Sequence, residues 1–241
     1  MTNLLFQTDS YIIKFNAIVT DQDAENRSIQ MDNTAFYPGG GGQPCDHGML
    51  IVDGYNHPVT RVKKVGSEIL HFLDGSGPIP ETGQEITGIL DWERRYKLMR
   101  THTAMHILCG VIFRDYGASV TGGEMDLLKG RMDFEFETLR AEFVHEIEES
   151  INREIQKDLE VNIDILPRED AFKIPDLIRT KINLLPSGIE FVRTVEIKGL
   201  DLQADGGTHV HRTAEVGRIK IVDYKSKGAI NKRIYVEILD E

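Results

Sequence analysis

The sequence predicts an α+β protein, in which a small N-terminal β-barrel (residues 1–90) precedes a two-layer α+β domain (residues 91–241). Three observations support this prediction. Residues 1–90 consist of short alternating runs separated by turn residues, which is typical of small barrels. The composition changes near residue 91, where a helical pattern begins. Beyond it, two helical segments and several strand-like runs favour helices packed on an antiparallel sheet.

Five runs in the first part show the apolar patterning of strands. They span residues 11–19, 28–32, 48–52, 59–65 and 69–73. Asp-Gly and Gly-Pro pairs lie between or after them and supply the turns that antiparallel neighbours need. We expect these strands to form the barrel.

Four consecutive glycines, residues 39–42, interrupt this pattern. Glycines weaken a regular strand, but without side chains they let the backbone approach a ligand closely. The segment is not a Walker loop, because no Gly-Lys-Ser/Thr sequence follows it. It also lacks the strand-to-helix setting of the dinucleotide fingerprint. We interpret it as a ligand-binding loop, with an ordinary flexible loop as the alternative.

The first helix is expected from residue 91 to about residue 116, and it carries His102 and His106. Four residues make about one helical turn, so both imidazoles leave the same face of the helix. Two neutral imidazoles in this arrangement are a familiar zinc chelate. Thr103 stands where the His-Glu-x-x-His motif places its glutamate, so a metalloprotease is not expected. The alternative is a pair of core histidines among apolar neighbours.

The rest of the second part contains a strand at residues 130–137, a second amphipathic helix beginning near residue 138, and further strands. Those strands span residues 161–166, 189–197, 216–222 and 232–239. Between the second and third of them, Asp205 and His209 flank a double glycine at i, i+4. We expect this loop to meet the histidine helix around one zinc ion.

The net charge of −11 argues against a large non-specific nucleic-acid surface. The charge is uneven, however, because residues 212–233 hold seven basic and two acidic side chains. Such a stretch can contact a phosphate backbone, although solvated strand faces explain it equally well. Apolar runs are too short for a membrane span, no signal-peptide pattern is evident, and two unrelated cysteines make no disulfide framework. We therefore expect a cytoplasmic protein with no membrane partner.

Four segments together resemble a known family. They are Thr-Ala-Phe-Tyr-Pro-Gly-Gly-Gly-Gly-Gln-Pro at residues 34–44, the histidine helix, Asp-Gly-Gly-Thr-His-Val at residues 205–210, and the basic tail at residues 225–234. In this order they resemble the editing region of alanyl-tRNA synthetase and its free-standing relatives, the AlaX-type trans-editing proteins of medium length. Each segment is weak alone, but the ordered set covers almost the whole chain.

This resemblance implies a zinc-dependent hydrolase that removes serine, or glycine, from mischarged tRNA(Ala). By position, His102, His106 and His209 fall on the family's zinc ligands, where they would also serve catalysis. The fourth position is normally a cysteine, and here it holds Asp205. A carboxylate can bind zinc, or it can instead hold a ligand water or His209. No Ser-His-Asp or Cys-His pair stands out in the sequence, so we expect water to be the nucleophile, without a covalent intermediate.

The resemblance also implies two further groups of site residues. The substrate-binding candidates are Thr34, Gly40, Gly41, Gly42 and Gln43. The tRNA-binding candidates are Lys225, Lys227, Lys232 and Arg233. Ordinary strand and turn polarity is the alternative for Thr34 and Gln43.

Three other functions remain open from the sequence. The histidine-zinc domain type is shared with threonyl-tRNA synthetase, so the substrate can be seryl-tRNA(Thr). The zinc can also be purely structural in a non-catalytic RNA-binding module. A zinc hydrolase of small esters is the third. A monomer and a homodimer are both compatible with the sequence.

Overall fold

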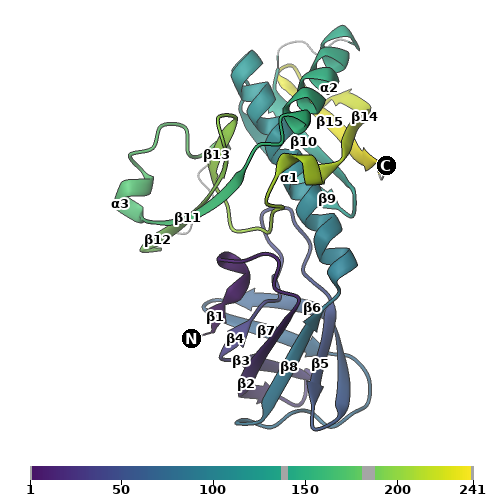
Figure 1. Ribbon diagram of the computed structural model, residues 1–241, viewed down its shortest axis with the longest axis vertical. Helices are drawn as coiled ribbons and strands as arrows, with labels where there is room; N and C mark the ends of the chain where they lie inside the picture. The colour runs from purple at the N-terminus through teal and green to yellow at the C-terminus, as the bar shows by residue number, and fades with distance from the viewer. Residues whose placement is uncertain (1, 137–140, 181–187, 240–241) are drawn as a thin grey trace. The chain divides into compact units, whose positions relative to one another are not determined.

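The computed structural model describes residues 2–136, 141–180 and 188–239 of the chain. They fall into two compact units, Met1–Lys97 and Leu98–Glu241. The fold is mixed α+β with antiparallel sheets and a closed six-stranded barrel (Figure 1), so the α+β class predicted from the sequence is confirmed. Within the described ranges, no helix is long and apolar enough to cross a bilayer.

The barrel lies in the first unit, and each strand pairs with its two neighbours in antiparallel register. In barrel order the strands are β2 (Lys14–Asp23), β3 (Ser28–Met31), β7 (Glu68–Leu73), β6 (Tyr55–Val65), β5 (Gly48–Val52) and β8 (Glu85–Leu90). Alternate side chains point inward and form the core, so closure removes the edge strands and buries one face of every strand. Gly88 is required here, because a Cβ at that position would lie 2.3 Å from the Phe15 ring.

Three short elements complete the first unit. They are β1 (Asn3–Leu4), the 3-10 turn η1 (Leu5–Gln7) and β4 (Asn33–Thr34). β1 and β4 pair in parallel, and the glycine-rich segment follows β4 directly.

A buried ion pair holds the chain on both sides of the glycine-rich segment. Arg95, in the first turn of α1 (Trp92–Tyr116), is fully buried and pairs with Asp46. The same guanidinium donates hydrogen bonds to the carbonyl oxygens of Ser10, at 2.8 Å, and Ala35, at 2.5 Å. The Asp46 carboxylate in turn accepts the Tyr37 N–H at 2.6 Å. One buried cation therefore fixes the chain before and after the four glycines.

The glycines themselves form a tight turn. Gly40 and Gln43 exchange two backbone hydrogen bonds, of 3.0 and 2.9 Å. All four glycines have positive φ angles, between 56° and 139°. These are conformations that residues with a side chain rarely adopt, so the glycine run is required by the turn.

In the second unit, α1 continues to Tyr116 and packs with α2 (Ala141–Gln156) beside a four-stranded antiparallel sheet. The strand order is β14 (Arg218–Ser226), β15 (Asn231–Leu239), β10 (Lys129–Glu135) and β9 (Val120–Asp126). The apolar stripe expected on the second helix consists of Phe143, Ile147, Ile151 and Ile155; its three isoleucines are buried, whereas Phe143 is 38% exposed.

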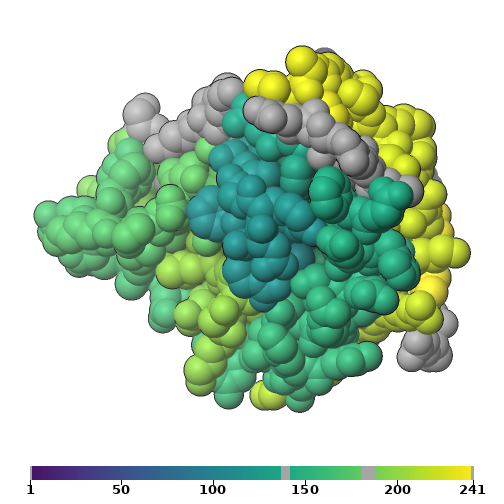
Figure 2. All heavy atoms as spheres, turned by 90° about the horizontal axis from the view of Figure 1, so that it is seen from above, coloured from purple at the N-terminus to yellow at the C-terminus, as the bar shows by residue number. Residues whose placement is uncertain are grey.

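A second, three-stranded antiparallel sheet lies on the other side of α1. It consists of β11 (Val161–Pro167), β12 (Phe191–Ile197) and β13 (Asp201–Ala204), with α3 (Arg168–Ala171) between the first two strands. The 3-10 turn η2 (Thr213–Val216) leads into β14. Seen from above, α1 lies between this sheet and the β14–β15 hairpin (Figure 2).

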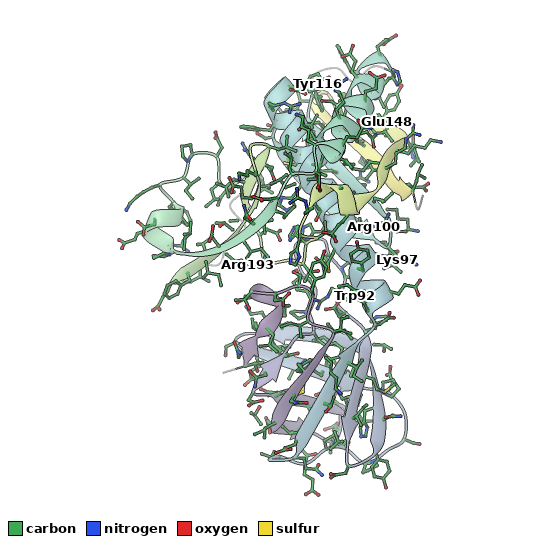
Figure 3. The ribbon with its side chains drawn as sticks, viewed as in Figure 1. Trp92, Lys97, Arg100, Tyr116, Glu148 and Arg193 are labelled. Carbon is green, nitrogen blue, oxygen red and sulfur yellow. The ribbon has the colours of Figure 1, made fainter. Side chains whose placement is uncertain are left out.

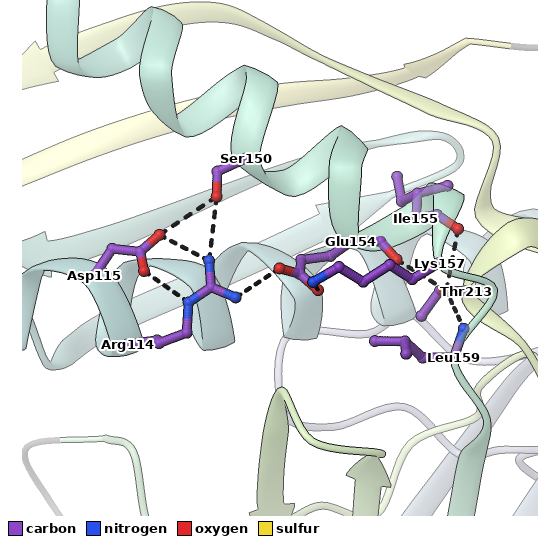
Figure 4. Close-up of polar contacts among 8 residues, drawn as sticks. All are labelled: Arg114, Asp115, Ser150, Glu154, Ile155, Lys157, Leu159 and Thr213. Carbon is purple, nitrogen blue, oxygen red and sulfur yellow. Dashed lines mark hydrogen bonds and ion pairs between the residues drawn. The ribbon is translucent and has the colours of Figure 1, made fainter.

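A polar network fastens the end of α1 to α2 (Figure 4). Arg114 donates to Glu154 at 2.6 Å and to Ser150 at 3.2 Å, and it also pairs with its neighbour Asp115. Lys157 completes the network on Glu154 at 2.7 Å. Because the Glu154 side chain is only 6% exposed, these charged contacts are largely shielded from water and fasten the C-terminal end of the histidine helix to α2.

Candidate metal centre

The middle of α1 is enclosed on all sides, and this places its two histidines in the interior. Leu98, Met99 and Ile107 are fully buried, and His102 and His106 are 4% and 5% exposed. The two rings leave the same side of the helix with their centroids 5.2 Å apart. The predicted helix and the shared histidine face are therefore present.

The loop after β13 is fixed against its surroundings by backbone contacts. Asp205 donates its N–H to the Arg193 carbonyl at 3.1 Å, and Arg193 Nη1 donates to the Asp205 carbonyl at 2.9 Å. Arg193, a residue of β12, is labelled in Figure 3. The N–H of Val210 donates to the Thr103 hydroxyl on α1 at 3.2 Å. Both ends of the loop are thus held, one by β12 and one by the histidine helix.

The structure brings the four predicted metal ligands together. One ligand atom from each of His102, His106, Asp205 and His209 lies within 4.8 Å of the other three. Asp205 Oδ2 is 3.4 Å from His102 Nε2 and 3.9 Å from His106 Nε2. Asp205 Oδ1 is 3.8 Å from His209 Nε2, and it also accepts the Gly207 N–H at 2.6 Å.

Burial and mutual charge set the protonation of this cluster. Burial and the charges of His102 and His106 hold the pKa of His209 well below its ordinary value. Burial alone would raise the pKa of Asp205, but the neighbouring His102 outweighs it and keeps that pKa well below its ordinary value. For His106, burial is likewise outweighed by the carboxylates of Asp201 and Asp205, which raise its pKa to about 9. In the metal-free cluster an ionised Asp205 carboxylate therefore lies beside a His106 ring that carries an extra proton, and a metal ion that binds His106 would displace this proton.

The donor set fits a small divalent metal ion. Ligand atoms about 2.1 Å from a tetrahedral ion lie about 3.4 Å from one another. Asp205 Oδ2 lies 3.4 Å from His102 Nε2 and 3.9 Å from His106 Nε2, and one ligand atom from each of the four residues lies within 4.8 Å of the others, so side-chain movements of about an ångström would bring the four to such a geometry. Three imidazoles and one carboxylate are ligands that borderline metals accept.

The sequence prediction did not include Asp201, which touches the cluster from behind. Its Oδ2 lies 2.9 Å from His106 Nδ1, the ring nitrogen that does not face Asp205. The sequence does contain a signal for Asp201. Successive side chains of a strand point to opposite faces, so Asp201 and Gln203 of β13 and Asp205 directly after it share one side.

The predicted substrate residues lie in the first unit. Thr34 is fully buried, and its hydroxyl contacts His71 Nε2 at 2.8 Å and accepts the Phe36 N–H at 3.1 Å. Gly40, Gly41 and Gly42 are exposed on the turn that the buried Gln43 closes. Their role in substrate binding stays a prediction.

The predicted tRNA-binding residues lie on the β14–β15 hairpin and differ in their surroundings. Lys225 and Lys227 are exposed, and Lys225 lies 2.8 Å from Asp223. Lys232 is only 7% exposed, and its Nζ donates to the turn carbonyls of Gly228 and Ala229 at 2.8 Å each.

Arg233, the fourth tRNA-binding candidate, grips Asp133 of β10 with two hydrogen bonds, of 2.6 and 2.8 Å. Its side chain is 17% exposed. Lys232 and Arg233 therefore make contacts that stabilise the hairpin, in addition to any contact with RNA. The side chains of Lys225 and Lys227 are exposed to solvent. The tRNA role of all four stays a prediction.

Comparisons with known proteins agree with this arrangement. Residues 192–235, which include Asp205 and His209, match the family described as the threonyl and alanyl tRNA synthetase second additional domain. Residues 7–94 match the family of class II (A) tRNA synthetases. Both matches relate the chain to the class of aminoacyl-tRNA synthetase domains.

Full-length relatives specify the family. The alanyl-tRNA editing protein AlaX-M of Saccharolobus solfataricus is 39% identical over 240 residues, 99% of each chain, and that of Methanosarcina acetivorans is 37% identical over 246 residues, 100% of each. The alanine–tRNA ligase of Pyrobaculum neutrophilum is 39% identical over 227 residues, which are 91% of this chain and 25% of the ligase. The chain belongs to the AlaX-M family of alanyl-tRNA editing proteins. The resemblance and the enzyme class predicted from the sequence are therefore confirmed.

Proposed function

We propose that this protein is a free-standing deacylase that hydrolyses the ester joining serine, or glycine, to tRNA(Ala), using a zinc ion held by the four-residue cluster. The observation that carries the proposal is the convergence of two helical histidines with a carboxylate and a third histidine about a hundred residues later. Full-length similarity to alanyl-tRNA editing proteins supports the substrate class.

We assign His102, His106, His209 and Asp205 as the residues that hold the ion. A zinc ion bound in such a site supplies Lewis-acid chemistry, which polarises an ester carbonyl or acidifies a water molecule. Asp205 Oδ1 is engaged by the Gly207 N–H, so Oδ2 is the oxygen that we assign as the ligand. The Oδ1 atom, which accepts the N–H of the residue two positions later, also stabilises the conformation of the loop.

Hydrolysis of an aminoacyl ester requires a placed water molecule more than a strong nucleophile, because the ester is already activated. The three histidines are almost fully enclosed, with at most 5% of each residue exposed. Such burial strengthens every charge interaction in the site and admits few competing waters. We assign water as the nucleophile and no covalent intermediate.

Discrimination of serine from alanine requires a polar contact for one hydroxyl group. We assign this role to Thr34 and Gln43, with the amides of Gly40, Gly41 and Gly42 approaching the substrate where no side chain intervenes. The Thr34 hydroxyl also contacts His71, so Thr34→Val must be judged on a correctly folded variant. Unchanged deacylation of the seryl ester by that variant removes Thr34 from the site.

On the β14–β15 hairpin we assign Lys225 and Lys227 to the tRNA phosphates, with Lys232 and Arg233 as the residues that shape this surface. Exposed cations contribute to phosphate binding through counterion release, and the exposed Lys225 would exchange its surface pair with Asp223 for a phosphate more easily than Arg233 would leave the largely buried Asp133. The acidic net charge of −11 favours a local contact of this kind over a broad one.

Deacylation assays with purified protein test the proposal, with seryl-, glycyl- and alanyl-tRNA(Ala) and seryl-tRNA(Thr) as substrates and metal analysis alongside. Hydrolysis of seryl-tRNA(Ala) that spares alanyl-tRNA(Ala), with about one zinc per chain, is the expected result. Activity on seryl-tRNA(Thr) alone would instead make the protein an editing enzyme for tRNA(Thr). The matched second additional domain is described for both threonyl and alanyl tRNA synthetases. Tight tRNA binding without hydrolysis by the metal-loaded protein would make it a non-catalytic module.

A further inference from the structure

A second polar group lies behind His106, on the side of the ring opposite the metal cluster. Asp201 Oδ2 lies 2.9 Å from His106 Nδ1. Gln203 Nε2 donates to the same oxygen at 2.7 Å. Arg179 Nε lies 3.5 Å from the other carboxylate oxygen, and its guanidinium stacks 3.7 Å above the Phe113 ring. The Asp201 side chain is completely enclosed.

An enclosed carboxylate is costly unless it is paired and hydrogen-bonded, so its position needs a reason. Helix α1 makes room for it with a glycine. A Cβ on Gly110 would lie 2.9 Å from Leu200 Cγ and 3.0 Å from both Asp201 Cβ and the Leu200 carbonyl oxygen. Glycine inside a helix costs about 1 kcal/mol relative to alanine. Two features therefore lower the stability of the fold where the Asp201 carboxylate meets His106. They are the glycine inside α1 and the buried carboxylate at the start of β13.

We propose that Asp201 is a positioning residue, which holds the His106 ring so that Nδ1 carries the proton and Nε2 faces the metal cluster. A histidine ligand commonly donates its other ring N–H to a carboxylate, which fixes the tautomer and the ring orientation. Gln203 and Arg179 hold the carboxylate itself in place. The proposal rests on the metal site of the proposed function, and it adds a residue that acts through a ligand without touching the ion.

The competing explanation is that Asp201 and His106 form an ion pair that only stabilises the fold. The two explanations predict different effects of Asp201→Ala. A positioning role predicts a 10- to 100-fold loss of zinc affinity, the usual effect of removing such a partner, beyond any change in the stability of the metal-free protein. A purely structural role predicts lower stability of the metal-free protein and an unchanged zinc dissociation constant.

The test measures the zinc dissociation constant by competition with a chromogenic chelator, on the full chain, for wild type and five variants. Asp201→Ala should bind about 10- to 100-fold more weakly. Asp201→Asn should keep most of the affinity, because its oxygen can still accept the His106 proton while Gln203 orients the amide. His209→Ala, a ligand variant, should lose the site. Asp164→Asn, which changes an exposed carboxylate on β11, the far strand of the same sheet, should change nothing.

Histidine ¹H–¹⁵N spectra of the zinc-loaded protein show which ring nitrogen carries the proton, a property that a change in folding stability alone does not alter. The His106 signals should report a protonated Nδ1 in wild type and in Asp201→Asn. If Asp201→Ala does not fold, Gly110→Ala still decides between the two explanations. The added methyl group of Gly110→Ala should displace Asp201 and weaken zinc binding severalfold.

Wild-type zinc affinity in a folded Asp201→Ala variant would overturn the positioning role. If Asp201→Ala does not fold, wild-type affinity in Gly110→Ala would do so. In either case the metal site itself stands if His209→Ala has lost zinc. Protonated Nε2 on His106 in the zinc-loaded wild type would overturn it as well. A wild-type protein that binds no zinc would overturn both this inference and the metal of the proposed function.

Discussion

The Thr103 hydroxyl on α1 accepts the Val210 N–H at 3.2 Å, and this bond joins the histidine helix to the end of the loop that carries Asp205 and His209. Thr103 is fully buried between His102 and Ala104 on the helix. The residue that excludes a metalloprotease motif therefore has a structural task of its own, which is to close the loop over the cluster.

Thr103→Val should weaken both the fold and the metal site. Valine keeps the shape of threonine but leaves the buried Val210 N–H without its acceptor, which costs about 1–3 kcal/mol. Urea unfolding of the metal-free protein measures this loss, and zinc affinity should fall with it. Thr20→Val, on an exposed position of β2, is the matched control and should be neutral. Equal stability of the two variants would contradict the role of this bond.

Arg95 and Asp46 form the buried ion pair that frames the glycine-rich turn, and removing one partner should be costly. Asp46→Asn or Arg95→Met leaves a buried charge without compensation, so we expect a loss of about 3–5 kcal/mol in the free energy of unfolding. Lys97→Met breaks an exposed i, i+4 pair with Glu93 and should cost less than about 0.5 kcal/mol. Denaturant unfolding of the three variants compares the pairs, and similar losses from the buried and the exposed pair would be inconsistent with this framing role.

His71 inside the barrel should make stability depend on pH. Burial lowers the pKa of His71 to about 4 in the folded protein, against 6.5 for an ordinary histidine. The unfolded chain then binds a proton that the folded chain excludes, so stability is complete above pH 6.5 and falls as the pH drops towards 4. The loss should approach about 3 kcal/mol at pH 4.

The measurement for His71 is urea unfolding between pH 7 and pH 4, compared with His71→Gln. The variant has no titrating ring, so its stability should fall less steeply over this window, even if it is less stable at pH 7. Parallel curves for the two proteins would show that His71 is protonated in the folded state as easily as in the unfolded one. Other acid-sensitive groups cancel in this comparison because both proteins contain them.

The hairpin lysines should contribute to tRNA binding through charge alone. A Lys225→Ala/Lys227→Ala variant should weaken binding and reduce the slope of log affinity against log salt, by at most about one unit for each lysine that meets a phosphate. Filter binding at several salt concentrations measures both quantities. Lys63→Ala/Lys64→Ala removes two exposed charges from β6 and is the matched control. An unchanged slope in the hairpin variant would mean that these lysines do not meet the phosphates.

Local patterns in the sequence predicted the parts of the site that lie within one element. The spacing of His102 and His106 required only a helix, and the alternating runs predicted the strands of a barrel. Long-range contacts could not be predicted in this way. Whether Arg233 is available to RNA depends on Asp133, which lies on the neighbouring strand but 100 residues away in the chain. The strand period places Asp201 on the same side as Asp205, but its contact with His106 depends on the close approach of Asp201 to Gly110 of α1, which no local pattern encodes.

Asp205 offers the sharpest test of the metal centre, because its position carries a cysteine in the family pattern. Asp205→Ala removes a ligand and should weaken zinc binding by more than about 100-fold, since even the loss of an outer partner costs about 10- to 100-fold. Asp205→Cys supplies a thiolate, which suits zinc at least as well, and should retain the metal. Chelator competition and metal analysis compare both variants with wild type. Thiolate lacks the oxygen that accepts the Gly207 N–H, so Asp205→Cys should also loosen the loop and lower thermal stability in the metal-free state. Full zinc affinity in a folded Asp205→Ala variant would show that the three histidines hold the ion without the carboxylate.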